Sequence, residues 1–255
     1  VAVARILDDL AEVGVKRCEW TGLVDGPSGG PARRVEIEVA EALAAATTWV
    51  TATILLDQQS GVLVQSLERL AAVDWDQRDQ VAGPLAELLE WYSVGRQLAK
   101  PPTVVLAGAT NVGKSSLLNA LLGFGRAIVW DEPGTTRDVI AGHTALEGWP
   151  VRLVDTAGLR VTDDEVEVVG IEHARRELET ADLVLLVVDG SQPIDDESRR
   201  LMCELNDAVV VANKCDLQNA TDGELPGETL AVSALTGAGI DGLAAAIVAR
   251  LVPRM

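Results

Sequence analysis

The feature that most constrains the fold of this 255-residue chain is segment 108–116 (GATNVGKSS), which follows the apolar run 103–108. It matches the pattern Gly-x-x-x-x-Gly-Lys-Ser, in which a glycine-rich turn joins a buried strand to the start of a helix. The glycines let backbone amides come close to phosphate oxygens. An ordinary glycine-rich turn has a similar composition, but the expected strand before it and helix after it favour a phosphate-binding loop.

The chain from residue 103 onward alternates between apolar runs and helical stretches. The runs are 103–108, 151–158, 182–190, 207–216 and 230–234, and the stretches lie near 115–122, 166–180, 195–205 and 240–251. Continuously apolar runs are typical of strands buried on both faces of a parallel sheet. Segment 143–154 differs, because two short runs flank a Gly-Trp-Pro turn, and it predicts an antiparallel hairpin at the sheet edge. We therefore expect an α/β doubly wound, mainly parallel sheet with one antiparallel edge strand, and a ligand at the carboxyl ends of the strands.

The first part of the chain has a helical pattern instead. Apolar residues recur at steps of three and four from Val39 to Ile54, continue from Leu63 to Leu70 after Gly61, and resume from Val81 to Tyr92. We interpret these stripes as core packing between helices. Pro101 and Pro102 end this pattern. The predicted organisation is an uncertain segment 1–34, a small α-helical domain 35–100 and a nucleotide-binding domain 102–255.

The phosphate-binding loop predicts specific contacts with a nucleotide. Lys114 is expected to neutralise β- and γ-phosphate oxygens, and the Ser115 hydroxyl is expected to ligate Mg²⁺. Asp155 and Gly158 end the run 151–158; the carboxylate would hold Mg²⁺ through a water and the Gly158 amide would meet the γ-phosphate. The loop residues expected at the nucleotide are Asn111, Val112, Gly113, Lys114, Ser115 and Ser116.

Segment 130–138 (WDEPGTTRD) lies between the loop and Asp155. A threonine here normally completes the Mg²⁺ shell only while the γ-phosphate is present, so the segment would act as a switch. We expect Thr136 to be this ligand.

The choice of base is predicted by segment 213–216 (NKCD). The Asp216 carboxylate can accept from both N1–H and the exocyclic amine of guanine, a donor pair that adenine lacks. Lys214 is expected to cover the base, and Asn213 to tie neighbouring loops together. Segment 233–235, which is Ser233, Ala234 and Leu235, is expected to offer a backbone amide to the guanine O6. The motifs in this order predict a protein that binds GTP as Mg-GTP.

The residue after Asp155-Thr156-Ala157-Gly158 is Leu159, which cannot hydrogen-bond through its side chain. Ras-like GTPases have a water-orienting glutamine at this place. Either hydrolysis is negligible, or another polar group and another positive charge replace the glutamine. The Asn111 side-chain oxygen could coordinate a monovalent cation beside the phosphates.

Segments 108–140 and 151–190 together resemble the MnmE/TrmE family of tRNA-modification GTPases. The resemblance covers residues 103–251, and residues 35–98 are more weakly similar to the family's helical domain. Neither the family's N-terminal folate-binding domain nor its C-terminal Cys-x-Gly-Lys end is recognisable in this sequence.

The resemblance implies a K⁺-stimulated GTPase whose G domains pair across their nucleotide faces as a homodimer. It implies K⁺ ligands at Asn111, the Thr135 hydroxyl and the carbonyls near Trp130 and Glu132. The family's catalytic glutamate corresponds to Glu167, which would orient the water, so the expected catalytic residues are Glu167, Lys114 and Thr136. It also implies a partner protein in tRNA modification.

Composition restricts the other partners. Acidic residues outnumber Lys and Arg by 39 to 21, for a net charge of −18, which argues against broad binding to nucleic acid or anionic membrane. Three widely spaced cysteines fit a reducing cytoplasm. Two alternatives stay open: a GTP-binding interaction module with negligible hydrolysis, which Leu159 favours, and a ribosome-assembly GTPase, which would need an RNA-binding appendage.

Overall fold

The computed structural model describes residues 31–73, 79–124, 141–156, 175–217, 225–226 and 228–252. These residues form two compact units. Residues 31–45, 54–73 and 79–81 belong to one unit, while residues 46–53 and the described residues from 82 onward form the other.

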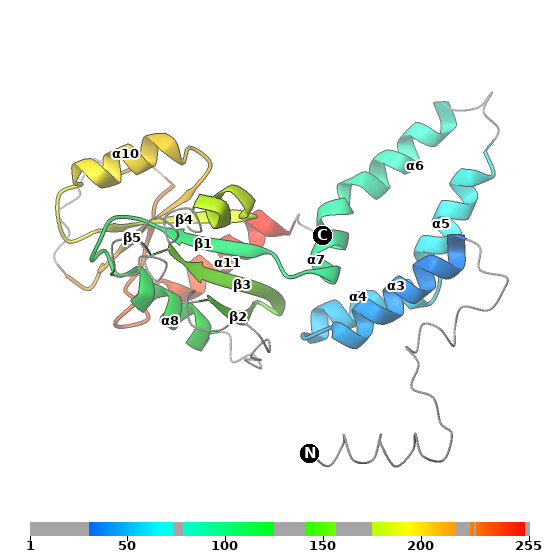
Figure 1. Cartoon of the computed structure of the whole chain (residues 1–255), viewed down its shortest axis with the longest axis horizontal. Helices are drawn as coiled ribbons and strands as arrows, with labels where there is room; N and C mark the ends of the chain where they lie inside the picture. Colours follow the sequence, from blue (N-terminus) through cyan, green and yellow to red (C-terminus); the bar gives the residue numbers. More distant parts are fainter. Residues whose placement is uncertain are drawn as a thin grey trace, which may run out of the picture. The chain divides into compact units, whose positions relative to one another are not determined.

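The larger unit contains a six-stranded sheet with the strand order β2-β3-β1-β4-β5-β6 (Figure 1). Only the β2–β3 pair is antiparallel among these strands, and the other four pairings are parallel. The strands are β1 (Thr103–Ala107), β2 (Ala141–Leu146), β3 (Trp149–Asp155), β4 (Leu183–Asp189), β5 (Val209–Asn213) and β6 (Leu230–Ala231). The expected doubly wound fold with one antiparallel edge strand is confirmed.

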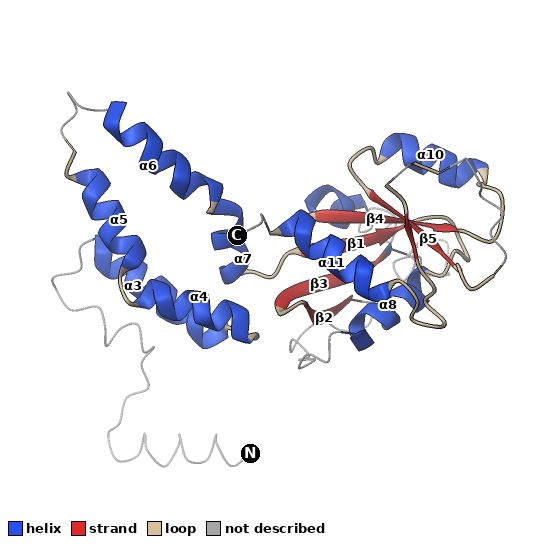
Figure 2. Cartoon of the chain, turned by 180° about the vertical axis from the view of Figure 1, so that it is seen from behind, coloured by secondary structure: helices blue, strands red, loops and turns tan. Residues whose placement is uncertain are grey.

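Helices cover both faces of the sheet, which explains why its central strands are apolar throughout. α8 (Lys114–Phe124) and α11 (Ile240–Leu251) contact each other, while α10 (Asp196–Glu204) lies across the sheet from α8 (Figures 1 and 2). Leu186 and Val188 of β4 join the cluster beneath α10. The intervening Leu185 and Val187 are also fully buried. A central parallel strand therefore has no polar face.

The hairpin forms at the predicted edge, but its turn differs from the expectation. Glu147 and Gly148 occupy the turn with φ values of 47° and 85°, and β3 begins at Trp149. Two consecutive positive φ angles are typical of a tight hairpin turn whose twist matches its strands. The prediction of a Gly-Trp-Pro turn is therefore wrong, because Trp149 and Pro150 already belong to β3, where they pair with Leu146 and Ala145 of β2.

The helical part is more interrupted than its apolar stripes predict. Its helices are α3 (Pro31–Ala45), α4 (Trp49–Gln59), α5 (Val62–Ala71), α6 (Asp79–Glu90) and α7 (Tyr92–Ala99). The first stripe is broken at residues 46–48, where the Thr48 hydroxyl accepts from the Thr51 amide at 3.3 Å. Threonine there replaces a helical backbone bond with a local side-chain bond. Gly61, at φ 91°, separates α4 from α5.

The interpretation of these stripes as core holds for some helices only. Val39 of α3 and Leu55 of α4 are buried. In contrast, α5 has no buried residue and its Leu67 is 41% exposed. The core interpretation is therefore wrong for α5 in the described structure. No helix among the described residues is long and apolar enough to cross a bilayer.

Candidate nucleotide-binding site

A pocket of about 430 Å³ lies at the carboxyl end of β1, where the chain turns into α8. Its lining residues come from the loop, the first turn of α8 and the end of β3: Gly108, Thr110, Asn111, Gly113, Lys114, Ser115, Ser116 and Thr156. The location agrees with the rule that ligands of doubly wound sheets bind at the carboxyl ends of strands.

Two loop glycines are required by close packing as well as by backbone conformation. Gly108 has φ 146°, and a Cβ there would lie 2.2 Å from the Val187 carbonyl oxygen. Gly113 has φ 94°, and its Cβ would lie 2.3 Å from Asn213 Nδ2. Asn111 also has a positive φ, 63°, which asparagine tolerates better than most residues. The loop is therefore fixed against β4 and β5 before any ligand enters.

Lys114 is held inside this loop. The residue is 6% exposed, and its Nζ donates to the carbonyl oxygens of Gly108 at 2.9 Å and Ala109 at 2.6 Å. A cation bordering a pocket lined by backbone amides favours an anionic ligand. Phosphate is the ligand that this loop motif predicts.

Two of the three expected Mg²⁺ ligands, Ser115 and Asp155, meet at the base of the pocket. Ser115 Oγ donates to Asp155 Oδ2 at 2.5 Å, and Asp155 is fully buried at the end of β3. The described residues contain no group of three or more His, Cys, Asp or Glu that could hold a metal by themselves. Hydroxyl and carboxylate oxygens suit Mg²⁺, which commonly takes its remaining ligands from phosphates and water. The donor set therefore fits Mg²⁺ together with a nucleotide.

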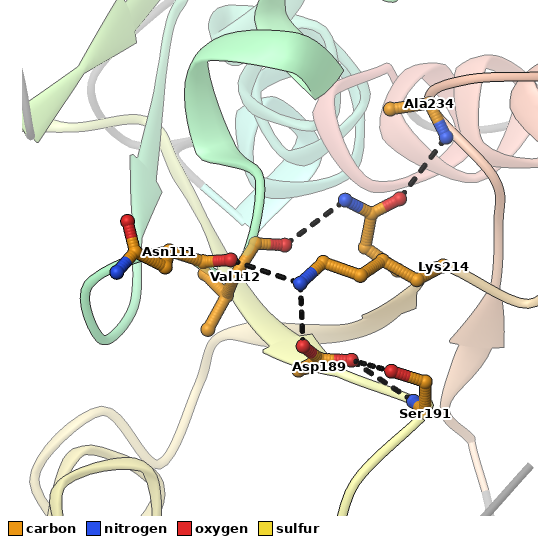
Figure 3. A network of polar contacts seen from close by, with 7 residues as sticks. Asn111, Val112, Asp189, Ser191, Lys214 and Ala234 are labelled. Carbon is orange, nitrogen blue, oxygen red and sulfur yellow. Dashed lines mark hydrogen bonds and ion pairs between the residues drawn. The ribbon is translucent and has the colours of Figure 1, made fainter. Parts of the chain in front are cut away.

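Asn213 joins the base-recognition segments to the phosphate loop. It is 2% exposed, its Nδ2 donates to the Val112 carbonyl at 3.0 Å, and its Oδ1 accepts from the Ala234 amide at 3.0 Å. Figure 3 shows these bonds running from the loop at Val112 to Ala234. The tie between loops that the sequence predicts for Asn213 is confirmed.

Lys214 makes a second connection to the same loop. Its Nζ donates to the Asn111 carbonyl at 3.0 Å and to Asp189 Oδ2 at 2.5 Å (Figure 3). Asp189 also accepts from the Ser191 hydroxyl and amide at 2.6 Å and 3.0 Å. Burial raises the pKa of Asp189, but the hydrogen bonds from Lys214 and Ser191 outweigh it, so its pKa lies below the ordinary value. Asp189 is therefore ionised at neutral pH and the ion pair is intact.

Asp216 is positioned by Ser233 from the neighbouring segment. Ser233 is fully buried, and its Oγ donates to Asp216 Oδ1 at 2.5 Å and accepts from the Thr236 amide at 3.1 Å. Asp216 itself is exposed, so its carboxylate is oriented and still open to a ligand. Leu235 is 86% exposed at the same edge.

Several predicted site residues lie outside the described residues: Trp130, Glu132, Thr135, Thr136, Gly158 and Glu167. Their roles stay predictions. Of the predicted K⁺ ligands, only Asn111 is described, and its side-chain amide points away from Lys214 (Figure 3). The sequence interpretation missed Asp189, although its position at the end of the apolar run 182–190 was the available signal.

The sheet order, the pocket on the phosphate loop and the base-recognition segment define a P-loop GTPase G domain. A family model described as "50S ribosome-binding GTPase" matches residues 103–214. The enzyme class predicted from the motifs, a GTP hydrolase, is confirmed by this match and by the relatives.

The relatives are tRNA modification GTPases named MnmE. The MnmE of Geobacter metallireducens is 46% identical over 173 residues, which are 66% of this chain and 38% of that protein. The MnmE of Syntrophotalea carbinolica is 43% identical over 223 residues, 77% of this chain and 48% of that protein. That of Carboxydothermus hydrogenoformans is 49% identical over 141 residues, 54% of this chain and 31% of that protein. The resemblance to the MnmE family is confirmed over the G domain, and the chain spans less than half the length of these relatives.

Among solved structures, the G domain of the T. maritima FeoB iron transporter is 27% identical. It matches with a TM-score of 0.42 over 58% of this chain and 98% of that domain.

Proposed function

We propose that this chain is a K⁺-stimulated GTPase that takes part in the modification of tRNA, as the names of its relatives suggest. We further propose that the modified base is a wobble uridine. The observation that best supports a specific GTP site, on which hydrolysis depends, is the pair of Asn213 bonds, to Val112 and to Ala234. They hold the phosphate loop and the base-recognition segments in one fixed arrangement. Phosphates and guanine can therefore be bound together without reorganising the site.

The chain's own residues bind the triphosphate and stabilise the charge that it develops. Lys114 and the loop amides face the phosphates, and Ser115 and Asp155 would hold Mg²⁺. When bound, Mg²⁺ neutralises charge on the β- and γ-phosphate oxygens. Thr136 and the Gly158 amide are proposed to close on the γ-phosphate. The nucleotide-binding set is completed by Ser116, Lys214, Asp216 and segment 233–235.

Water activation needs a substitute for the missing glutamine, because Leu159 has no polar side-chain atom. We assign this role to Glu167. K⁺ would be held by Asn111 and Thr135 with the carbonyls near Trp130 and Glu132, and it would supply positive charge beside the phosphates. Two copies of the G domain are proposed to pair across their nucleotide faces.

The domain boundaries follow the same proposal. Residues 35–100 would form the helical domain and residues 102–255 the G domain, with a partner protein supplying the rest of the tRNA-modifying site. The acidic balance of 39 to 21 favours a protein partner over a broad RNA surface.

GTP turnover is expected to be about tenfold faster in KCl than in NaCl at equal ionic strength and high protein concentration, with Mg²⁺ present. A cation of the right size beside the phosphates would lower the barrier by about 1.4 kcal/mol. Phosphate release under saturating GTP measures this effect.

Equal turnover in the two salts would eliminate the K⁺ mechanism and leave the GTPase assignment. Bound GTP with no turnover in either salt would favour the alternative of an interaction module. GTP-dependent co-sedimentation with ribosomes would favour the ribosome-assembly alternative.

Glu167→Ala is expected to lower kcat by about 100-fold, because a positioned general base contributes roughly that factor. The Kd for GTP should change by less than about twofold, since the water-orienting group contributes to the transition state only. The neighbouring Glu165→Ala is the matched control, and a similar loss of kcat in both variants would contradict a specific role for Glu167. Single-turnover hydrolysis with bound GTP separates the two quantities.

A further inference from the structure

Asp189 lies where the phosphate and base segments meet, yet it belongs to neither nucleotide motif. It ends β4, and its register partner across the sheet is Asn213, which ends β5. The carboxylate accepts from Lys214 Nζ through one oxygen and from Ser191 through the other. Its side chain is 18% exposed, compared with 32% for Lys214. The pair is therefore partly shielded and less weakened by solvent than a surface ion pair.

Lys214 has two partners, and the second is the phosphate loop. Its Nζ bonds the Asn111 carbonyl at 3.0 Å, while Asn213 Nδ2 bonds the next carbonyl, that of Val112, also at 3.0 Å. Two consecutive loop carbonyls are thus held on the side of the base-recognition segment. In a trans peptide the N–H points opposite to the C=O, so the amides of Val112 and Gly113 point away from that segment. These two amides belong to the phosphate-binding part of the loop.

Lys214 would not keep this position unaided. Its backbone is in the left-handed region at φ 67°, and its long side chain loses rotamer entropy when it is fixed. A carboxylate that is itself fixed by two bonds from Ser191 reduces the freedom of the ammonium group. Figure 3 shows the chain of contacts from Ser191 through Asp189 and Lys214 to Asn111.

We propose that Asp189 is a positioning residue that, through Lys214, aims the Val112 amide at the phosphates and so links guanine binding to phosphate binding. This deepens the proposed function, because it rests on the pocket being a GTP site. Asp189 touches no phosphate and no base. Its effect reaches the nucleotide through Lys214 only.

The test compares the full chain carrying Asp189→Ala, Lys214→Met or both substitutions. Asp189→Ala is expected to weaken both GDP and GTP about tenfold, the effect of losing one charge-assisted contact. In the Lys214→Met background the same substitution should change the Kd by less than about twofold, because its route to the nucleotide is already removed. If Asp189→Ala weakened nucleotide affinity tenfold both in the wild-type chain and in the Lys214→Met variant, the proposal would be overturned.

Asp195→Ala is the matched control. Asp195 caps α10 by accepting from the Ser198 amide at 2.6 Å, so its loss destabilises the chain without touching Lys214. This control variant should leave the Kd for GDP unchanged, although its melting temperature should drop about as much as that of Asp189→Ala. Asp189→Asn, which keeps an acceptor for Ser191, is the variant to use if Asp189→Ala does not fold, and its expected loss is about threefold.

Amide hydrogen exchange of the nucleotide-free chain gives a second readout that does not need GTP. Asp189→Ala is expected to speed exchange in peptides covering residues 108–114 about tenfold and to leave those covering α10 unchanged. Unchanged exchange in the loop would overturn the proposal. A wild-type chain that binds neither GDP nor GTP would overturn the proposed function instead, while the exchange result would still test the role of Asp189.

Discussion

Replacement of Lys114 by methionine is expected to lower the affinity for GTP by about 1,000-fold, the largest loss of affinity expected from a single substitution in this chain. The ammonium borders the pocket and is already desolvated at 6% exposure, so its contacts with phosphate oxygens are strong. Two charge-assisted hydrogen bonds of about 2 kcal/mol each correspond to a factor of this size. Methionine keeps the apolar stem, so the loss reports the charge and its hydrogen bonds.

The measurement is equilibrium binding of a fluorescent GTP analogue, accompanied by thermal unfolding. Lys114→Met also leaves the Gly108 and Ala109 carbonyls without the ammonium donor, so a stability loss of about 1–3 kcal/mol is expected. Lys100→Met, at an exposed position before β1, is the matched control and should change neither quantity. GTP affinity within about tenfold of wild type in Lys114→Met would contradict the assignment of this loop to phosphates.

The parts of the fold that were predicted correctly depend on patterns that are local in the sequence. Strands buried on both faces must be apolar throughout, and β1, β3, β4 and β5 were recognisable for that reason. The phosphate loop was recognisable because glycine is required at Gly108 and Gly113, where a side chain would collide with other segments. Local requirements of this kind are visible without knowledge of the tertiary structure.

The errors have a different origin. An apolar stripe indicates which face of a helix is buried but not where the helix ends. The periodicity therefore did not reveal that the helix is interrupted at Thr48. The same pattern placed α5 in a core, although the described structure leaves Leu67 exposed. At the hairpin, Gly-Trp-Pro (148–150) has turn composition, but the backbone turns at Glu147 and Gly148, one residue earlier, and Trp149 already belongs to β3.

Asp189 shows why part of the site could not be predicted. Its position at the end of the apolar run 182–190 is a weak signal, because an aspartate at the end of an apolar strand is common. Its significance comes from the parallel register that places it beside Asn213, and from Lys214 reaching across to Asn111. Such a role depends on three segments far apart in the chain, and it becomes visible only in the folded protein.

Asp216→Asn is expected to reverse the base preference, by lowering the affinity for GTP at least 100-fold and raising that for xanthosine triphosphate. The carboxylate accepts from two guanine donors, whereas asparagine offers one acceptor and one donor, and its donor would face the guanine amine. Xanthine carries an oxygen in place of that amine and can accept from asparagine. Because Ser233 holds Asp216 through Oδ1 at 2.5 Å, the replacement should keep the orientation of the side chain.

Competition between the two triphosphates for a fluorescent nucleotide measures the preference. The matched control is Asp207→Asn, a change at an exposed position two residues before β5. The ratio of the two affinities should move by about 10⁴, the range for sites that lose a paired hydrogen bond with the wrong ligand. A variant that still prefers GTP would show that guanine is recognised elsewhere. A variant that binds neither triphosphate, with wild-type thermal stability, would show that Asp216 contributes its negative charge to binding and does not recognise the pattern of donors on the base. Only a reversed preference agrees with a carboxylate that accepts both guanine donors, which is the chemistry that separates a GTPase from an ATPase on the same phosphate loop.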